Sequence, residues 1–255
     1  ALLDDLPPGR LALTTDSYVV HPIEFPGGDI GKLAVCGTVN DLAAAGARPE
    51  WFSAAFILEE GLELDLLRRV VASMAAAAAE AGVAVVTGDT KVVERGAAEG
   101  LFISTSGVGR IYEGTDVRGG GARPGDLLVV TGTVADHGAA VMMARQGLEL
   151  SDTLASDCAP LGGLVGEALA GGLEIHALRD PTRGGLATTL VELAHQSGVR
   201  MVLEEARVPV APPVRQACDL LGLDPLYVAN EGKMIVILPP AAAAPFLALA
   251  RAHPY

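Results

Sequence analysis

The sequence predicts an α/β (α+β) protein built in two halves. Short apolar stretches rich in β-branched residues alternate along the chain with longer stretches that carry apolar residues at helical spacing. The 31 glycines and 16 prolines of the 255 residues are spread widely, as expected for the many turns of a globular protein. A glycine-rich, charged stretch at residues 112–126 interrupts the alternation and predicts a boundary. We therefore expect one domain at residues 1–115 and a second at 124–255.

The first half is predicted to contain four strands and two helices. Aromatic and β-branched residues favour the strands, and Gly82 is placed to end the second helix in a left-handed cap. The third strand is expected to be fully buried, because it is too short and too rich in β-branched residues for a helix. The expected strands are residues 10–20, 50–58, 83–89 and 100–111, and the expected helices are residues 31–45 and 62–82.

The second half opens with a predicted apolar strand from Leu127, whose residue pattern resembles that of the strand before Asp89. In both, apolar residues lead into Thr-Gly and then an aspartate. Strands and helices continue to interleave, which supports the mixed class. The expected helices are residues 138–146, 161–170 and 185–197, and the expected strands are residues 174–178 and short segments near Met201 and Ile235.

Composition excludes several classes of partner. The formal net charge is −13 and no basic run is present, so nucleic acid and anionic membranes are poor partners. No apolar run reaches the roughly 20 residues that span a bilayer, and no signal-peptide pattern opens the chain. The three cysteines are far apart and fit neither a zinc site nor a disulfide framework, which predicts a cytoplasmic protein.

Four aspartates stand where predicted elements begin or end: Asp16, Asp41, Asp89 and Asp180. Each could be a helix cap or a solvated turn residue. Alternatively, carboxylates with few histidines or thiols nearby are the ligands of a hard cation such as Mg²⁺. Two such charges ~4 Å apart repel by roughly 4 kcal/mol at an effective dielectric of 20. If these aspartates converge on a polyphosphate, a divalent cation is therefore implied.

The segment "DPTRGGLATTLVELAHQSG" raises the same choice. Asp180 and Thr182 precede a predicted helix, two glycines leave its start without side chains, and Arg183 adds a positive charge. A helix N-terminus with free N–H groups could hold a phosphate. An ordinary Asp or Thr N-cap, with glycines that allow tight packing, explains the same sequence equally well.

Lys91 and Glu231 are the candidate catalytic residues. Lys91 follows an apolar strand at once, and Glu231 lies in "NEGKM", where a turn meets an apolar strand. Either alone is an ordinary surface residue. Together at a phosphate site they would suit a lysine that binds the transferring phosphoryl group and a carboxylate that accepts a proton.

The motifs "TTDSYVVHPIEFPGGDIGKLAVCGTVNDLAAAGA", "FILEEGL", "VTGDTKVV", "LRDPTRGGLA" and "NEGKM" resemble the HypE family, the carbamoyl dehydratases of [NiFe]-hydrogenase maturation. The similarity runs from about Leu13 to Pro239. The wider superfamily includes aminoimidazole ribonucleotide synthetase, selenophosphate synthetase and thiamine-monophosphate kinase. The resemblance implies an aminoimidazole-ribonucleotide-synthetase-like fold of two domains, whose N-terminal half forms a β-rich homodimer interface.

The resemblance also implies an activity and a site. The reaction would convert a C-terminal cysteine S-carboxamide into the S-cyanate, using ATP and Mg²⁺, to supply the cyanide ligands of the hydrogenase. Partners would be the carbamoyltransferase HypF and the HypC–HypD scaffold complex. Lys91 and Glu231 would be catalytic. Asp16, Asp41 and Asp89 would hold Mg-ATP with Thr90 nearby, and Asp180, Thr182 and Arg183 would line the phosphate side.

The chain departs from the family pattern at its ends. The family's Gly/Ser-rich opening loop and its terminal Pro-Arg-x-Cys tail are absent, so the chain is expected to be truncated. Two alternatives stay open: another phosphoryl-transfer enzyme of the superfamily, such as a selenophosphate synthetase, and a non-catalytic nucleotide-binding scaffold. Cys36 is expected to be a buried apolar residue, His137 a helix-start residue, and Trp51 and Phe52 core or dimer-interface residues.

Overall fold

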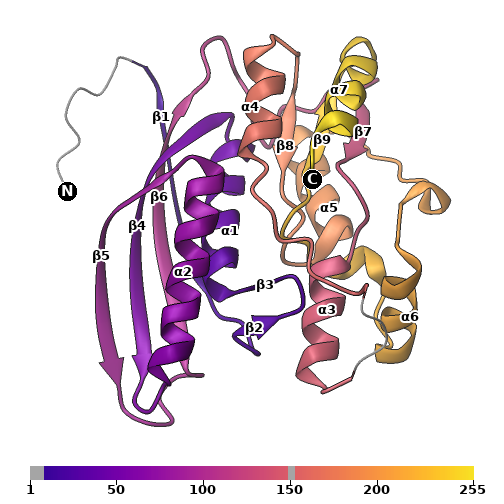
Figure 1. Cartoon of the computed structure of the whole chain (residues 1–255). Helices are drawn as coiled ribbons and strands as arrows, with labels where there is room; N and C mark the ends of the chain where they lie inside the picture. Colours follow the sequence, from indigo (N-terminus) through magenta and orange to yellow (C-terminus); the bar gives the residue numbers. More distant parts are fainter. Residues whose placement is uncertain (1–8, 149–152) are drawn as a thin grey trace.

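The computed structural model describes residues 9–148 and 153–255. Its first half is a four-stranded sheet with two helices on one face (Figure 1). The strands lie in the order β1-β6-β4-β5. Strand β6 pairs antiparallel with both β1 and β4, and β5 runs parallel to β4. A two-stranded hairpin leads into α1. The elements are β1 (Leu11–Tyr18), β2 (Glu24–Phe25), β3 (Gly28–Asp29), α1 (Ile30–Ala44), β4 (Ala47–Glu59), α2 (Leu64–Ala81), β5 (Ala84–Val93) and β6 (Leu101–Ile111).

Helix α1 is the buried centre of this half. Its start is fixed by Asp29, whose carboxylate accepts the N–H groups of Gly31 and Lys32 at 2.7 and 3.2 Å. Twelve of its 15 residues are buried, because the helix packs against β1, β6, α2 and the second half of the chain. An all-round buried helix has no polar face, which fits its lack of a clear apolar stripe.

The second half is a three-stranded antiparallel sheet between helices, in the order β7-β9-β8. The central strand β9 is buried on both faces: Val236 and Leu238 pack with α4 and α7, and Ile235 and Ile237 pack with α5. The elements are β7 (Leu127–Val130), α3 (Asp136–Arg145), α4 (Gly162–Ala170), β8 (Ala177–Arg179), α5 (Gly185–Ser197), η1 (Glu205–Arg207), α6 (Pro212–Leu221), η2 (Pro225–Tyr227), β9 (Ile235–Leu238) and α7 (Pro240–Ala252).

Most predicted elements are present within a few residues of their expected bounds, and Gly82 is the left-handed cap of α2. The predicted burial of the strand at residues 83–89 is wrong. β5 is an edge strand that continues through Lys91 to Val93, and its residues are exposed from Ala84 to Val92. A β-branched run fits an edge strand as well as a central one, so its composition could not separate the two.

Two further differences lie in the second half. No strand forms near Met201; the chain there has neither helix nor strand until η1. Helices α6 and α7 were not predicted, because each opens on proline, and α7 contains Pro245 as well. Proline at the first helical position is compatible with a helix, since the N–H it lacks would be unpaired there.

Among the described residues, no helix combines the length and apolar character needed to cross a bilayer. Cys36, Cys158 and Cys218 are free and buried, which confirms the expectation for Cys36. The cytoplasmic location expected from the cysteines stays a prediction.

Candidate active site

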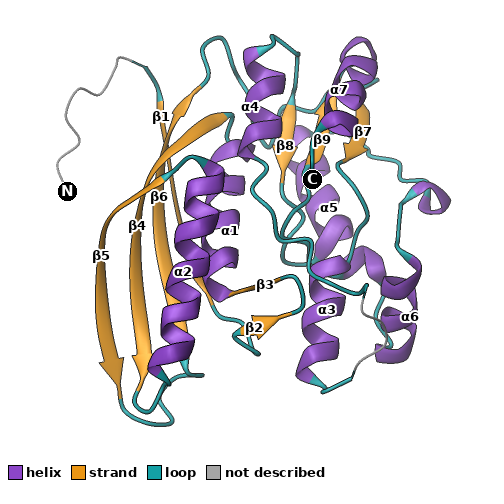
Figure 2. Cartoon of the chain, viewed as in Figure 1, coloured by secondary structure: helices purple, strands orange, loops and turns teal. Residues whose placement is uncertain are grey.

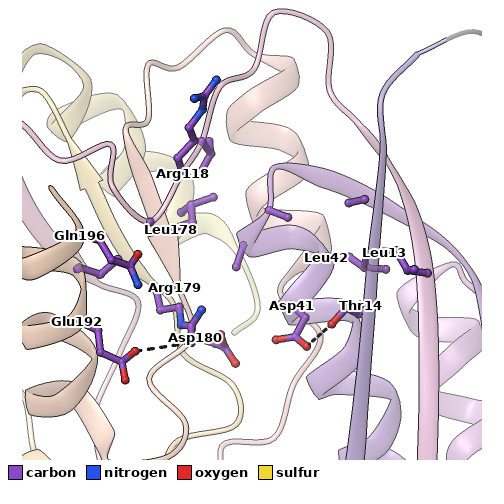
Figure 3. Close-up of a pocket in the computed structure, with 16 residues that line it drawn as sticks. Leu13, Thr14, Asp41, Leu42, Arg118, Leu178, Arg179, Asp180, Glu192 and Gln196 are labelled. Atoms are coloured by element: carbon purple, nitrogen blue, oxygen red, sulfur yellow. Dashed lines mark hydrogen bonds and ion pairs between the residues drawn. The ribbon is translucent and has the colours of Figure 1, made fainter.

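A cavity of about 490 Å³ opens between the two halves (Figure 3). β1 and α1 form one wall, and the end of β8 together with α5 forms the other. Figure 3 shows the carboxylates of Asp41 and Asp180 pointing toward one another across this space. The lining residues are Ala12, Leu13, Thr14, Asp41, Leu42, Ala44, Ala45, Val117, Arg118, Gly119, Leu178, Arg179, Asp180, Glu192, Leu193 and Gln196.

Strand β1 and helix α1 place the first two aspartates. Alternate residues of a strand share a face, so Thr14, Asp16 and Tyr18 all project toward α1. The hydroxyl of Thr14 donates to Oδ2 of Asp41 at 2.8 Å, and the Tyr18 hydroxyl meets that of Thr38 on α1 at 3.2 Å. Asp16 lies between these two contacts along β1; it is exposed and does not itself line the cavity.

Asp180 follows β8 directly and is 9% exposed. Burial and the charges of Asp41 and Asp16 raise its pKa to about 6, against the weaker opposing effect of Arg179. Burial also raises the pKa of Asp41, with a contribution from Asp16. Because Asp16 and Asp41 both act on Asp180, and Asp16 acts on Asp41, these three predicted site residues lie within electrostatic range in a single chain.

The turn after Asp180 leads into α5, and its N-cap is Gly184, with no capping side chain. The alternative that Asp180 or Thr182 caps this helix is therefore wrong. The glycines serve close packing: a Cβ on Gly185 would meet the carbonyl oxygen of Leu226 at 2.6 Å. Thr182 is half-buried and Arg183 exposed, and neither lines the cavity.

Glu231 reaches the same region through its neighbour Asn230. The Asn230 side chain is buried; it donates to the carbonyl of Pro181 at 2.8 Å and accepts the N–H of Ala135 at 2.7 Å. This ties the turn that carries Glu231 to the turn that carries Asp180. Burial, followed by the charges of Cys158 and Asp180, raises the pKa of Glu231 well above its ordinary value. A carboxyl in this state suits proton transfer near neutral pH.

Asp89, Thr90 and Lys91 lie elsewhere in the same chain. Asp89 is level with Ser17 of β1 at the opposite edge of the sheet, three strand spacings away, which is roughly 14 Å. Asp89 and Lys91 also project from the sheet face opposite α1. They form an exposed ion pair with each other, Nζ to Oδ2 3.0 Å. One chain therefore does not bring them to the cavity.

The predicted magnesium ligands can be tested against these positions. Among the described residues, no group of three His, Cys, Asp or Glu side chains is arranged to hold a metal ion. The triad of Asp16, Asp41 and Asp89 is accordingly not assembled within one chain. Asp41 and Asp180, with Asp16 beside them, remain a hard-oxygen donor set with uncompensated charge. Mg²⁺ is commonly held by one or two carboxylates together with phosphate oxygens, and these residues fit that mode.

The smaller predictions have clear outcomes. His137 lies in the first turn of α3, where its Nδ1 meets the hydroxyl of Ser156 at 2.8 Å and its ring packs edge-on against Phe25. Phe52 is a core residue, 1% exposed. Trp51 is half-buried on the sheet face that carries no helix.

Sequence reasoning missed several residues of this region. Arg118, Arg179, Glu192 and Gln196 line the cavity, and Arg179 and Glu192 approach to 3.9 Å along the wall formed by β8 and α5. Arg179, Glu192 and Gln196 lie in or beside the motif of Asp180 but look like ordinary surface residues of a strand end and a helix, and Arg118 lies in the connecting loop. Asp157 and Asn40, which bond to the Glu231 turn, were also missed. Asn40 could have been found, since it immediately precedes Asp41 in the motif "VNDLAAAG".

Fold and site together define the class. Residues 2–111 match the N-terminal domain of the AIR synthase related proteins, and residues 123–255 match the C-terminal domain of the same family. The carbamoyl dehydratase HypE of Rhodobacter capsulatus is 58% identical over 248 residues, 97% of this chain and 73% of that protein. The chain belongs to the HypE family of carbamoyl dehydratases.

Similar solved structures support this family assignment. A crystal structure of the hydrogenase maturation protein HypE in complex with ATP matches with a TM-score of 0.96 and 54% identity, covering 98% of this chain and 75% of that one. A HypE–HypF complex matches with a TM-score of 0.93 and 49% identity, covering 96% and 80%. The mixed α/β two-domain fold and the family expected from the motifs are thereby confirmed.

Replacing Asp180 by Asn should stabilise the nucleotide-free protein near neutral pH. The folded-state pKa of Asp180 is raised, from 3.8 to about 6, so its ionisation destabilises the fold progressively between these values and fully above them. We expect D180N to gain roughly 1–3 kcal/mol over the wild type at about pH 8 and nothing at about pH 4. Urea denaturation at both pH values measures this. Asp219→Asn, at an exposed position of α6, is the control, and an equal effect of D180N at both pH values would contradict the account.

Proposed function

We propose that this protein dehydrates a cysteine S-carboxamide to the S-cyanate at the expense of ATP, in the cavity between its two halves. The observation that carries the proposal is the cavity lined by Asp41 and Asp180, with Asp16 and Glu231 within electrostatic range of Asp180. The family membership supports it, as does the likeness to a HypE structure described as a complex with ATP. The product would supply the cyanide ligands of [NiFe]-hydrogenase.

The nucleotide would lie with its phosphates toward the aspartates. Asp41 and Asp180, with Asp16 nearby on β1, would hold the phosphates through Mg²⁺. Thr182 and Arg183 lie outside the cavity lining of this structure and would approach the phosphates from the uncapped start of α5. Mg²⁺ would supply positive charge for the developing charge of the γ-phosphoryl group. Without a cation, the triphosphate would be repelled by the carboxylates of Asp41 and Asp180, whose pKa values are raised by burial and then by neighbouring negative charge.

The chemistry balances as follows. An amide oxygen is a poor leaving group, so the γ-phosphoryl group is transferred to it and ADP is released. The two nitrogen protons are then removed, the C–O bond breaks, and inorganic phosphate leaves as the C≡N bond forms. The net reaction is R–S–CO–NH₂ and ATP to R–S–C≡N, ADP and phosphate. Positioning and electrostatic stabilisation would do most of the catalysis.

Two residues would act on the reacting atoms. Glu231 would accept a proton from the amide nitrogen, a role favoured by its burial and raised pKa. Lys91 would stabilise charge on the transferring phosphoryl group. Lys91 lies on the edge strand β5, away from the cavity of its own chain. The cavity it serves would therefore belong to a second copy.

A homodimer would meet this requirement. The sheet face opposite α1 carries exposed or half-buried apolar side chains from β1, β4 and β6, an arrangement that favours coverage by another protein surface. Pairing two such faces about a twofold axis would bury them and could carry the β5 edge of one copy to the β1 edge of its partner. Residues 1–115 would then be the ATP-binding and dimerisation domain, and 124–255 the second α/β domain. The apolar residues are Leu11, Leu13, Trp51, Ile57, Phe102 and Val108.

The proposed partners follow from the reaction. The carboxamide must be loaded by a carbamoyltransferase, and a relative of this chain is found in a HypE–HypF complex. We assign that role to HypF. The cyanide group must be passed on, and we assign its receipt to the HypC–HypD scaffold complex.

Glu231→Gln should abolish turnover but leave nucleotide binding intact. Glutamine keeps the shape of the side chain and removes the base, so we expect the rate to fall about 10²–10⁴-fold. The assay supplies Mg-ATP and a peptide ending in S-carbamoylcysteine, and follows ADP release together with nitrile formation. Glu167→Gln, exposed on α4, is the matched control. Wild-type turnover by Glu231→Gln would remove Glu231 from the mechanism.

A complementation experiment tests the shared site. Lys91→Ala and Asp180→Asn are each expected to be inactive as homodimers. Co-expressed with different tags and purified as the heterodimer, they should recover about half of the wild-type activity, because one of two symmetric sites receives both intact residues. A site built within one chain would leave every site with one defect, so an inactive heterodimer would contradict the shared arrangement.

A further inference from the structure

Residues 154–161, which lead into α4, are irregular but largely buried. Residues 154–161 form neither helix nor strand (Figure 2), and Cys158 to Leu161 are buried. Such a segment must satisfy its backbone polar groups with specific partners. The N–H of Ser156 donates to the carbonyl of Pro26 at 2.7 Å. Asn40 of α1 donates to the carbonyl of Ala159 at 3.1 Å and accepts the N–H of Leu161 at 2.8 Å. The segment is thus fastened to the first half of the chain.

The side chain of Asp157 turns from this segment toward the turn that holds Glu231. It is 3% exposed, and its two oxygens are divided between consecutive backbone groups. Oδ1 accepts the N–H of Glu231 at 3.2 Å, and Oδ2 accepts the N–H of Gly232 at 3.2 Å. Oδ2 also lies 3.6 Å from Nζ of Lys233. One buried carboxylate therefore fixes three successive residues of the turn.

The backbone packing leaves this turn little freedom. A Cβ on Gly232 would lie 1.7 Å from the carbonyl oxygen of Asp157, so only glycine permits the approach. On the other side, Asn40 donates to the carbonyl of Glu231 at 3.2 Å. Both peptide groups of Glu231 are thereby held, its N–H by Asp157 and its carbonyl by Asn40. Hydrogen bonds to an ionised carboxylate are stronger than neutral ones, which makes Asp157 the firmer of the two contacts.

We propose that Asp157 is a positioning residue for the dehydration, which holds the backbone of Glu231 so that its carboxyl meets the amide nitrogen of the substrate. This inference rests on the proposed role of Glu231 as the base. A purely structural alternative is that Asp157 is present only to neutralise the half-buried Lys233. The two differ in what they require of the backbone contacts, since only positioning depends on them.

Asp157→Asn tests the proposal. Asparagine offers one acceptor where the carboxylate offers two, so one of the two N–H groups loses its partner. We expect kcat to fall roughly 10–100-fold, as for a small misplacement of a catalytic group. The KM for the carbamoylated peptide and the Kd for Mg-ATP should stay within about twofold, since the contacts of both ligands are unchanged. Rates are expressed per nucleotide-binding site, titrated by calorimetry.

Two further variants make the outcome decisive. Lys233→Met removes the ion pair but keeps both backbone contacts, and should retain kcat within about twofold. The double variant Glu231→Gln/Asp157→Asn should be no slower than Glu231→Gln alone, because Asp157 acts through Glu231. Should Asp157→Asn fold poorly through its unpaired lysine, Asp157→Asn/Lys233→Met removes both charges and replaces it.

Normal kcat in a folded Asp157 variant would overturn the proposal. So would a Lys233→Met variant as slow as Asp157→Asn, or a double variant slowed by the product of the two single effects. Failure of the proposed function is distinguishable: there Glu231→Gln itself would turn over normally, whatever the Asp157 variants do.

Discussion

Asp41 and Asp180 line the cavity where the two halves of the chain pack, with Asp16 within electrostatic range of both, and the fold holds these carboxylates despite their burial and like charge. Burial, and after it the charge of neighbouring carboxylates, raises the pKa of Asp41 and of Asp180. An arrangement of like charges at a cavity is stable only if packing elsewhere supports it, and it becomes favourable when a cation arrives. The rest of the structure can be understood as the support for this one arrangement.

That support is a set of buried polar contacts between elements distant in the sequence. Asn40 of α1 bonds to residues 159, 161 and 231, and Asn230 joins the turn of Glu231 to that of Asp180. Buried amides with all partners satisfied give a rigid, specific geometry, whereas apolar contacts alone would tolerate small shifts. The turns that carry Asp180 and Glu231 are thus fixed relative to both sheets, and the sheet face opposite α1 is the surface on which we propose that a second copy packs.

Much of the fold and part of the candidate site could be predicted from the sequence. The alternating strand and helix patterns predicted the class, and the motifs around Asp16, Asp41, Asp180 and Glu231 indicated the family. The exposure of β5 was not accessible, because edge and central strands share the same β-branched composition. Helices α6 and α7 were hidden by prolines that happen to lie at their starts. Asp157 could not be found, since its role comes from a contact with residues 231 and 232, more than 70 positions away.

The sequence also could not say which candidates share a cavity. Asp89 and Lys91 stand in a motif as distinctive as that of Asp180, yet the sheet separates them from it by its full width. A distinctive motif indicates that its residues have a function. Only the strand topology indicates whether one chain can bring those residues to the same cavity. The sheet order β1-β6-β4-β5 places Asp89 and Lys91 at the edge far from β1, which is why the proposed site requires a second copy.

The most direct test of the central claim is calorimetric titration of the protein with ATP, with Mg²⁺ and with a chelator in its place. If the carboxylates require a cation to accept a triphosphate, the affinity should be at least about tenfold higher with Mg²⁺, and Asp41→Asn should reduce that difference. Equal affinity with and without Mg²⁺ would show that the converging charges do not govern nucleotide binding, and would contradict the account.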